Sequence, residues 1–269
     1  MTSVTAPTPV PSTAKRPAWG WAVTDAVTVT WRNLKGMSRV PEVIVFSTIQ
    51  PIIFVLTFRY VFGGAIRVPG DYVDFLMPGV FVQTIAFGSM GTGIGLSEDL
   101  HKGLIERFRS LPMARSAVLA GRTIADLLRN VFVMALMVVV GFFVGFDYHT
   151  SALAFVASIG LLLLFGMAMS WIFAVIGLAV PNAEATQAAS FPILALLVFA
   201  SSAFVPIETM PGWLQAYNNV QPVSVAVEAA RALALGGPTL VPVLQTTGWI
   251  VGLVAVFAPL AVARYRRSA

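Results

Sequence analysis

The chain has 269 residues, of which 57% are hydrophobic and only 11% are charged, well below the roughly 25% of charged residues in soluble domains. This composition excludes an ordinary soluble domain, and the absence of cysteine excludes disulfides and thiolate metal sites. The net charge of +5 does not indicate a nucleic-acid partner, because 14 of the 17 basic residues lie in three stretches, 15–39, 102–129 and 264–267, on one side of alternating hydrophobic runs.

The N-terminal part of the chain precedes any long hydrophobic run. Residues 1–18 are rich in Pro, Ser and Thr, which predicts a disordered cytoplasmic tail. Within residues 19–36, Val23, Val27 and Trp31 recur at helical spacing opposite a polar face. We expect an amphipathic helix that lies in the inner membrane interface, and a simple cytoplasmic lead-in is the alternative.

Six long hydrophobic runs fill most of the remaining chain. A bilayer core about 30 Å thick needs about 20 apolar helical residues to cross it, and it offers no water to backbone polar groups. We therefore predict an all-α polytopic membrane protein with six transmembrane helices, at about 43–63, 75–96, 123–146, 152–180, 188–206 and 244–263. The positive-inside rule places both termini in the cytoplasm of a multi-pass protein of the cell (plasma or inner) membrane.

The segment between the second and third runs predicts a short cytoplasmic helix at 98–111. Ser97 is a suitable N-cap, and Pro112 should end the helix. Leu100, Leu104 and Phe108 form an apolar ridge between charged flanks. Such a ridge suits docking into a groove on a cytoplasmic partner. The alternative is a surface segment that packs the ridge on the protein's own helix ends.

A charge cluster is predicted near the start of the third run. Arg122, Asp126 and Arg129 share one helix face at positions i, i+4 and i+7. Pairing offsets the cost of charges close to the bilayer. The cluster is either an ion-paired anchor at the inner boundary or a device that transmits movement from the cytoplasmic segment.

The long connection after the fifth run is too apolar for a solvated loop and too broken by Pro and Gly to cross the membrane. We predict a re-entrant helical hairpin at 206–235, with helical pieces at about 211–219 and 222–235. Glu228 and Arg231 should form a local pair, with a proton-relay role for Glu228 as the alternative. The residues that mark this hairpin are Pro206, Glu208, Pro211, Trp213, Pro222, Glu228 and Arg231.

Catalytic chemistry is not indicated. The two histidines, His101 and His149, are expected on opposite sides of the membrane, and no Gly-rich phosphate loop with its lysine occurs. Gly88, Gly91 and Gly93 lie in a span rather than after a strand, so they favour close helix approach or a hinge. We expect no catalytic, cofactor-binding or metal site in this chain.

The order of these parts resembles the ABC type-2 export permeases, above all the daunorubicin-resistance-type branch. Two stretches carry the resemblance: EDLHKGLIERFRSLPMARSAVLAGR at 98–122 and FVPIETMPGWLQAYNNVQPVSVAVEAARAL at 204–233. It covers nearly all of the chain after residue 18, so residues 19–269 would form one ABC type-2 transmembrane domain.

The resemblance implies that the helix at 98–111 is a coupling helix, which docks on a separate ATP-hydrolysing subunit that binds ATP and Mg. Two such ATPase subunits and a second permease subunit, identical or homologous, would complete the transporter. The hairpin would cap the outer end of the passage. The residues expected to couple to the ATPase are Glu98, Leu100, Leu104, Arg107, Phe108 and Leu111.

These features predict the membrane permease of an ATP-driven exporter. Apolar side chains on the first, second and fifth spans favour an amphiphilic, drug-like or lipid-like cargo that crosses at a seam between two permeases. The alternative is an ion-coupled secondary transporter without an ATPase. Such a transporter needs a titratable residue in mid-span, and the spans offer almost none.

Overall fold

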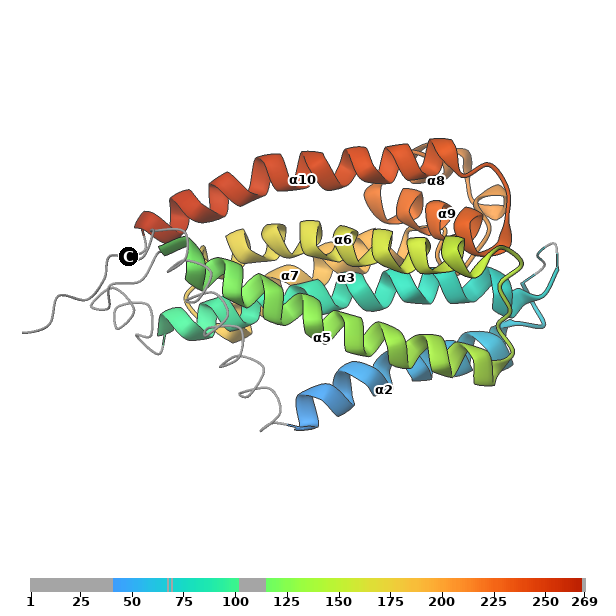
Figure 1. Cartoon of the computed structure of the whole chain (residues 1–269), viewed down its shortest axis with the longest axis horizontal. Coiled ribbons are helices and arrows are strands. Elements are labelled where there is room, and N and C mark those ends of the chain that lie inside the picture. Colours follow the sequence, from blue (N-terminus) through green and yellow to red (C-terminus); the bar gives the residue numbers. More distant parts are fainter. Residues whose placement is uncertain (1–40, 67, 69, 102–114, 268–269) are drawn as a thin grey trace, which may run out of the picture.

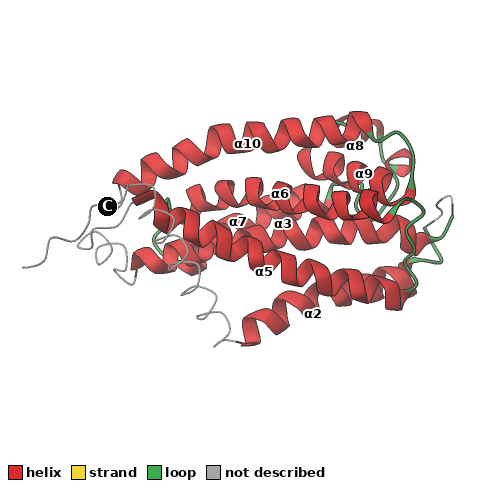
Figure 2. Ribbon diagram, viewed as in Figure 1, coloured by secondary structure: helices red, strands yellow, loops and turns green. Residues whose placement is uncertain are grey.

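The computed structural model describes residues 41–66, 68, 70–101 and 115–267, and the regular elements in these ranges are all helical (Figure 2). The sequence predicted an all-α protein, and the described residues confirm it. The helices are α2 (Pro41–Thr57, continued by a π-helical turn at Phe58–Phe62), α3 (Tyr72–His101), α5 (Arg115–Val144), α6 (Ala152–Gly177), α7 (Ala183–Phe199), a 3₁₀ turn (Ile207–Thr209), α8 (Gly212–Asn218), α9 (Pro222–Leu235) and α10 (Leu240–Arg267).

Four of these helices are long and apolar enough to cross a membrane: α3, the segment Thr123–Val144 of α5, α6, and the segment Leu240–Tyr265 of α10. They run along the long axis of the molecule (Figure 1). This confirms a polytopic membrane protein. The first and fifth predicted spans correspond to α2 and α7, which have 17 residues each. At 1.5 Å per residue, 17 residues span about 25 Å, so crossing by these two helices stays a prediction.

The helix α3 lies at the centre of the bundle, in contact with α2, α5, α6, α7 and α9. Glycines bring α3 and α6 close together. A Cβ at Gly93 would collide with the carbonyl group of Phe173, and one at Gly177 would collide with the carbonyl group of Gly93. Close backbone approach is how small residues hold helices together where lipid supplies no hydrophobic drive. The interpretation of Gly93 as a packing residue is confirmed.

Local signals set several helix ends. The Ser151 hydroxyl accepts a hydrogen bond from the Ala154 amide at 3.2 Å and starts α6, and Asn182 starts α7 in the same way. Pro222 occupies the first turn of α9, and Gly236, with φ of +99°, is the C-cap that follows its last residue, Leu235. The short helices α8 and α9 therefore lie where the pattern of Pro and Gly predicted them.

The two ends of the bundle differ. The C-terminal end holds the end of α10, the end of α3 and the beginning of α5, whereas α8 and α9 lie at the opposite end, which we call the hairpin end (Figure 1). The expected tail (1–18), interfacial helix (19–36) and most of the expected coupling helix, with Leu104, Arg107, Phe108 and Leu111, lie outside the described residues.

One predicted boundary is wrong. Ser97 was expected to cap a separate helix, but α3 continues without interruption through Ser97 to His101. The Ser97 side chain is buried, and its hydroxyl has no hydrogen-bond partner among the described residues, so it caps no helix there. Glu98 and Leu100 thus belong to the last turn of α3.

Candidate functional site

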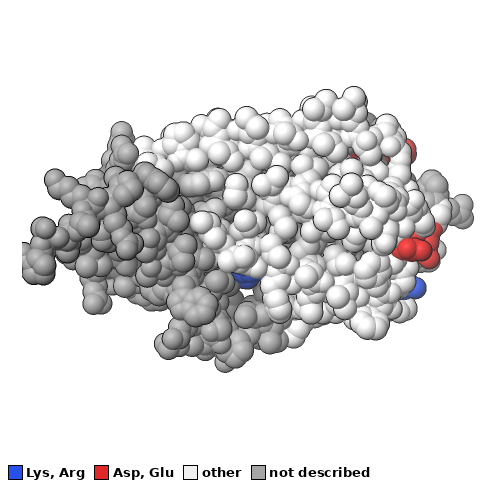
Figure 3. All heavy atoms as spheres, in the orientation of Figure 1, with Lys and Arg blue, Asp and Glu red and all other residues white. Residues whose placement is uncertain are grey.

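In the view of Figure 3 most of the described surface carries no charged side chain, and the acidic side chains that are visible lie at the hairpin end, next to a basic one. Inside the bundle, two groups of buried polar contacts join several helices. One lies at the contact between α3 and α5, and the other lies at the junction of α3, α7 and α9 at the hairpin end. Because buried polar groups cost free energy unless they are paired, these two places are the candidates for function.

At the contact between α3 and α5, the ion pair of Asp126 and Arg129 forms hydrogen bonds with the central helix α3. Asp126 accepts a hydrogen bond of 2.6 Å from the Thr92 hydroxyl and lies 3.7 Å from the Arg129 guanidinium. Arg129 also donates to the carbonyl oxygen of Gly88. A side chain at Gly91 would occupy the place of this guanidinium. The pair therefore depends on α3 as much as on α5.

Two members of the predicted charge cluster, Asp126 and Arg129, come together, while the side chain of Arg122 lies outside the described residues. Arg129 lies six residues, about 9 Å along the helix, inside the apolar segment that begins at Thr123. The sequence pattern did not identify Thr92 and Gly88 as partners of this pair, because they are on another helix.

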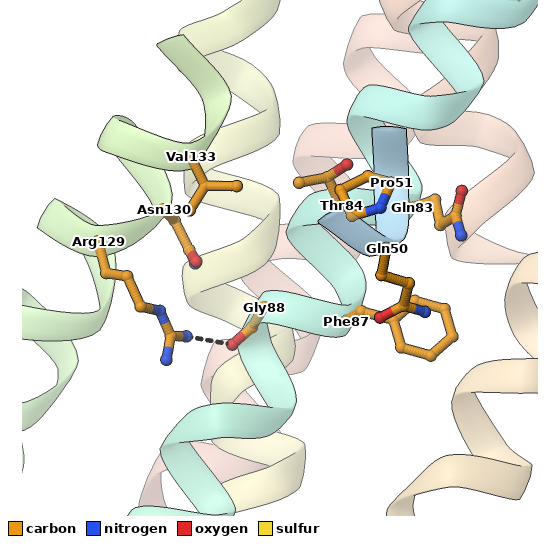
Figure 4. Close-up of a pocket in the computed structure, with 9 residues that line it drawn as sticks. All are labelled: Gln50, Pro51, Gln83, Thr84, Phe87, Gly88, Arg129, Asn130 and Val133. Atoms are coloured by element: carbon orange, nitrogen blue, oxygen red, sulfur yellow. Dashed lines mark hydrogen bonds between the residues drawn. The ribbon is translucent and has the colours of Figure 1, made fainter. Parts of the chain in front are cut away.

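A pocket of about 100 Å³ adjoins this ion pair, between α2, α3 and α5. Arg129, Asn130 and Val133 approach it from α5, and Gln50, Phe87 and Gln83 lie on the other side (Figure 4). Gln83 is only 2% exposed, and its Oε1 atom has no hydrogen-bond partner among the described residues. The full lining is Gln50, Pro51, Gln83, Thr84, Phe87, Gly88, Arg129, Asn130 and Val133.

At the hairpin end, Arg231 of α9 joins three segments. Its Nη1 atom pairs with Glu228 at 2.9 Å, as the i, i+3 spacing predicted, and Nη2 donates to the carbonyl oxygens of Ser202 and Ala203 at 2.7 and 3.2 Å. Its Nε atom donates to the carbonyl oxygen of Phe75 at 3.1 Å, and the guanidinium lies 3.6 Å from the centre of the Phe75 ring. Arg231 thus ties α9 to α3 and to the turn after α7.

Further hydrogen bonds fix the hairpin from its other side. Asn218 of α8 donates at 2.9 Å to the carbonyl oxygen of Ala200 and also bonds the Ser224 hydroxyl. The Trp249 indole of α10 donates to the carbonyl oxygen of Val220 at 3.0 Å. Asn218 and Ser224 were not among the predicted site residues, although polar side chains in so apolar a segment are the signal that would have found them.

The remaining predicted residues have simpler surroundings. Pro206 is buried, Pro222 is half-buried, and Glu208, Pro211 and Trp213 are exposed at the hairpin end. At the C-terminal end Glu98 is exposed and lines a hollow of about 310 Å³ with His101, Asn182, Ala183 and Glu184. Among the described residues no cluster of three or more His, Asp or Glu side chains is suited to a metal ion.

These features define a helical membrane protein with polar contacts between its helices. The chain belongs to the ABC-2 type transporter family, whose model matches residues 24–235. It is 38% identical over 258 residues to the daunorubicin resistance ABC transporter permease protein DrrB1 of Streptomyces coeruleorubidus, a match that covers 96% of this chain and 91% of the relative.

Two relatives from Mycobacterium tuberculosis are more distant. The probable doxorubicin resistance ABC transporter permease protein DrrC is 27% identical over 84% of this chain and 82% of its own length. The doxorubicin resistance ABC transporter permease protein DrrB is 26% identical over 86% of this chain and 85% of its own length. These similarities confirm the prediction of a permease of an ABC exporter.

Proposed function

We propose that this permease moves an amphiphilic, drug-like or lipid-like compound out of the cell with energy from a separate ATPase. The supporting observation is the 38% identity over 96% of the chain with a relative whose name states daunorubicin resistance. Two further relatives are named for doxorubicin resistance. The apolar surface of the bundle, with Ile53 of α2 and Leu196 of α7 more than half exposed, suits a cargo that enters from lipid.

The proposed transporter contains two copies of the ATPase, which bind ATP and Mg, and a second permease, identical or homologous. The seam between the permeases carries the cargo. In this arrangement α2 and α7 cross the bilayer with the four longer helices, both termini lie in the cytoplasm, and the hairpin at 206–235 dips into the outer leaflet and caps the passage. The acidic side chains at the hairpin end and the basic C-terminal stretch support this orientation.

Residues 98–111 are the proposed coupling segment. Glu98 and Leu100 form the last turn of α3, the helix that contacts α2, α5, α6, α7 and α9. A displacement of this end of α3 would move the helices that pack against it, because packed helices move as rigid elements. The ion pair of Asp126 with Arg129 would carry the same movement into α5.

The test is transport of doxorubicin into inside-out vesicles that contain this chain and its ATPase. We expect ATP-dependent uptake, and we expect Leu104→Glu with Phe108→Glu to abolish uptake while both subunits still reach the membrane. Leu153→Val, at a position on α6 that is 80% exposed and lies outside both the coupling segment and the hairpin, is the control and should transport normally. Uptake driven by a proton gradient without ATP would instead favour a secondary transporter, and unchanged assembly and uptake in the double variant would refute the coupling role.

A further inference from the structure

We propose that the pocket between α2, α3 and α5 binds the polar part of the cargo, and that it selects an uncharged group with hydroxyl or carbonyl oxygens. This inference rests on the proposed function, since it presupposes an amphiphilic cargo. It adds the place within one permease where the polar group is recognised, and it names the side chains that recognise it.

Two polar side chains of this pocket lie deep within the apolar part of the bundle. Gln83 follows the first residue of α3 by 11 positions, about 17 Å, and precedes the last residue, His101, by 18 positions. Asn130 lies near the middle of the 30-residue helix α5. Near a helix end, a buried amide side chain would cost little free energy. These amides are far from either end, so their cost is larger. Their presence needs a partner that apolar surroundings do not supply.

Helix packing does not use all of these polar groups. The Thr84 hydroxyl donates to the carbonyl oxygen of Val80 at 2.7 Å, and Arg129 is held by Asp126 and Gly88. The buried Oε1 atom of Gln83, in contrast, finds no partner in the described part of the chain. A buried acceptor of this kind lowers stability unless a ligand or water pairs with it. Gln50 is exposed on α2, so the pocket has a polar rim on that side.

The space around Asn130 depends on a glycine. A Cβ placed at Gly88 would lie 2.6 Å from the Oδ1 atom of Asn130, closer than real contacts allow. Gly88 therefore leaves the amide room beside the central helix.

The chemistry of the lining selects the ligand class. Arg129 is already paired with Asp126, so the walls offer no excess charge, and an anion would compete with that carboxylate. The amides of Gln50, Gln83 and Asn130 each carry donors and an acceptor, which match hydroxyl and carbonyl groups. Phe87 supplies an apolar wall.

The size of the pocket limits what it holds. Its volume is about 100 Å³. Drug-sized ligands need several hundred Å³, so only a substituent of the cargo fits. The apolar remainder would lie outside, against exposed side chains such as Ile49 and Ile53, which neighbour Gln50 on α2.

The test compares Gln83→Met and Asn130→Leu, which keep the side-chain volume and remove the amide. Ser190→Ala is the matched control, since the Ser190 hydroxyl is also buried without a partner among the described residues but is on α7 outside the pocket. Doxorubicin is the probe. Its KM for ATP-driven uptake is measured in vesicles with the ATPase, and its Kd is measured with the purified permease in nanodiscs.

We expect a rise of tenfold or more in KM and Kd for both pocket variants, with membrane level, melting temperature and ATPase assembly retained, and less than a twofold change for the control. Normal KM and Kd in the pocket variants, with an active wild type, would overturn this inference and leave the proposed function intact. Absence of ATP-driven uptake by the wild type would overturn the proposed cargo class and this inference together.

Discussion

Replacement of Arg231 by methionine should destabilise the hairpin end strongly, and the structure indicates where the loss arises. The Arg231 side chain is 10% exposed, and it donates to backbone carbonyl groups of Phe75, Ser202 and Ala203. Each hydrogen bond from a charged donor contributes about 1.5–3 kcal/mol, although such terms are not additive. We expect Arg231→Met to lower the free energy of unfolding by about 3 kcal/mol or more, because three buried carbonyl groups lose a charged donor.

The ion pair itself should contribute little of this loss. The Glu228 side chain is 42% exposed, and exposed pairs are worth about 1 kcal/mol or less. Glu228→Gln keeps an acceptor for Arg231 and for the Ser202 hydroxyl, which now donates to Glu228 at 3.1 Å. It should therefore cost less than about 1 kcal/mol. Arg231→Lys, which keeps the charge but not the planar fork, should fall between the two variants.

Reversible unfolding in mixed micelles measures all three variants under the same conditions. An equal loss for Glu228→Gln and Arg231→Met would show that charge pairing holds the hairpin, and a loss below about 1 kcal/mol for Arg231→Met would show that the carbonyl contacts contribute little. Either result would refute the role assigned to the carbonyl contacts of Arg231.

Two other substitutions test the packing and the ion pair of α3. Gly93→Val should prevent accumulation of folded protein in the membrane, because its side chain would collide with the Phe173 carbonyl group, whereas Gly160→Val, at an open position on α6, should accumulate normally in immunoblots. Asp126→Leu should lower stability by about 3 kcal/mol, since it leaves Arg129 without its carboxylate. Adding Arg129→Met should recover most of that loss in thermal unfolding, and no recovery would contradict the pairing.

Much of the helical framework was predictable from local features of the chain. The hairpin pieces expected at 211–219 and 222–235 correspond to α8 (Gly212–Asn218) and α9 (Pro222–Leu235), because Pro and Gly limit helices through their own backbone geometry. The error at Ser97 has the same origin. A capping residue is recognised from its neighbours in sequence, and those neighbours do not show whether the preceding residues already form a helix that continues through it.

The sequence by itself determined that this chain is helical, enters the membrane and belongs among ABC-2 type permeases. The length of the hydrophobic runs and the family motifs depend only on the types of side chain. Only the tertiary structure decided which groups on other helices the buried polar residues contact. Arg231 meets Phe75, 156 positions away, and Arg129 meets Gly88, 41 positions away. Their partners are backbone carbonyl groups, which every residue carries, so no pattern of side chains could have identified them.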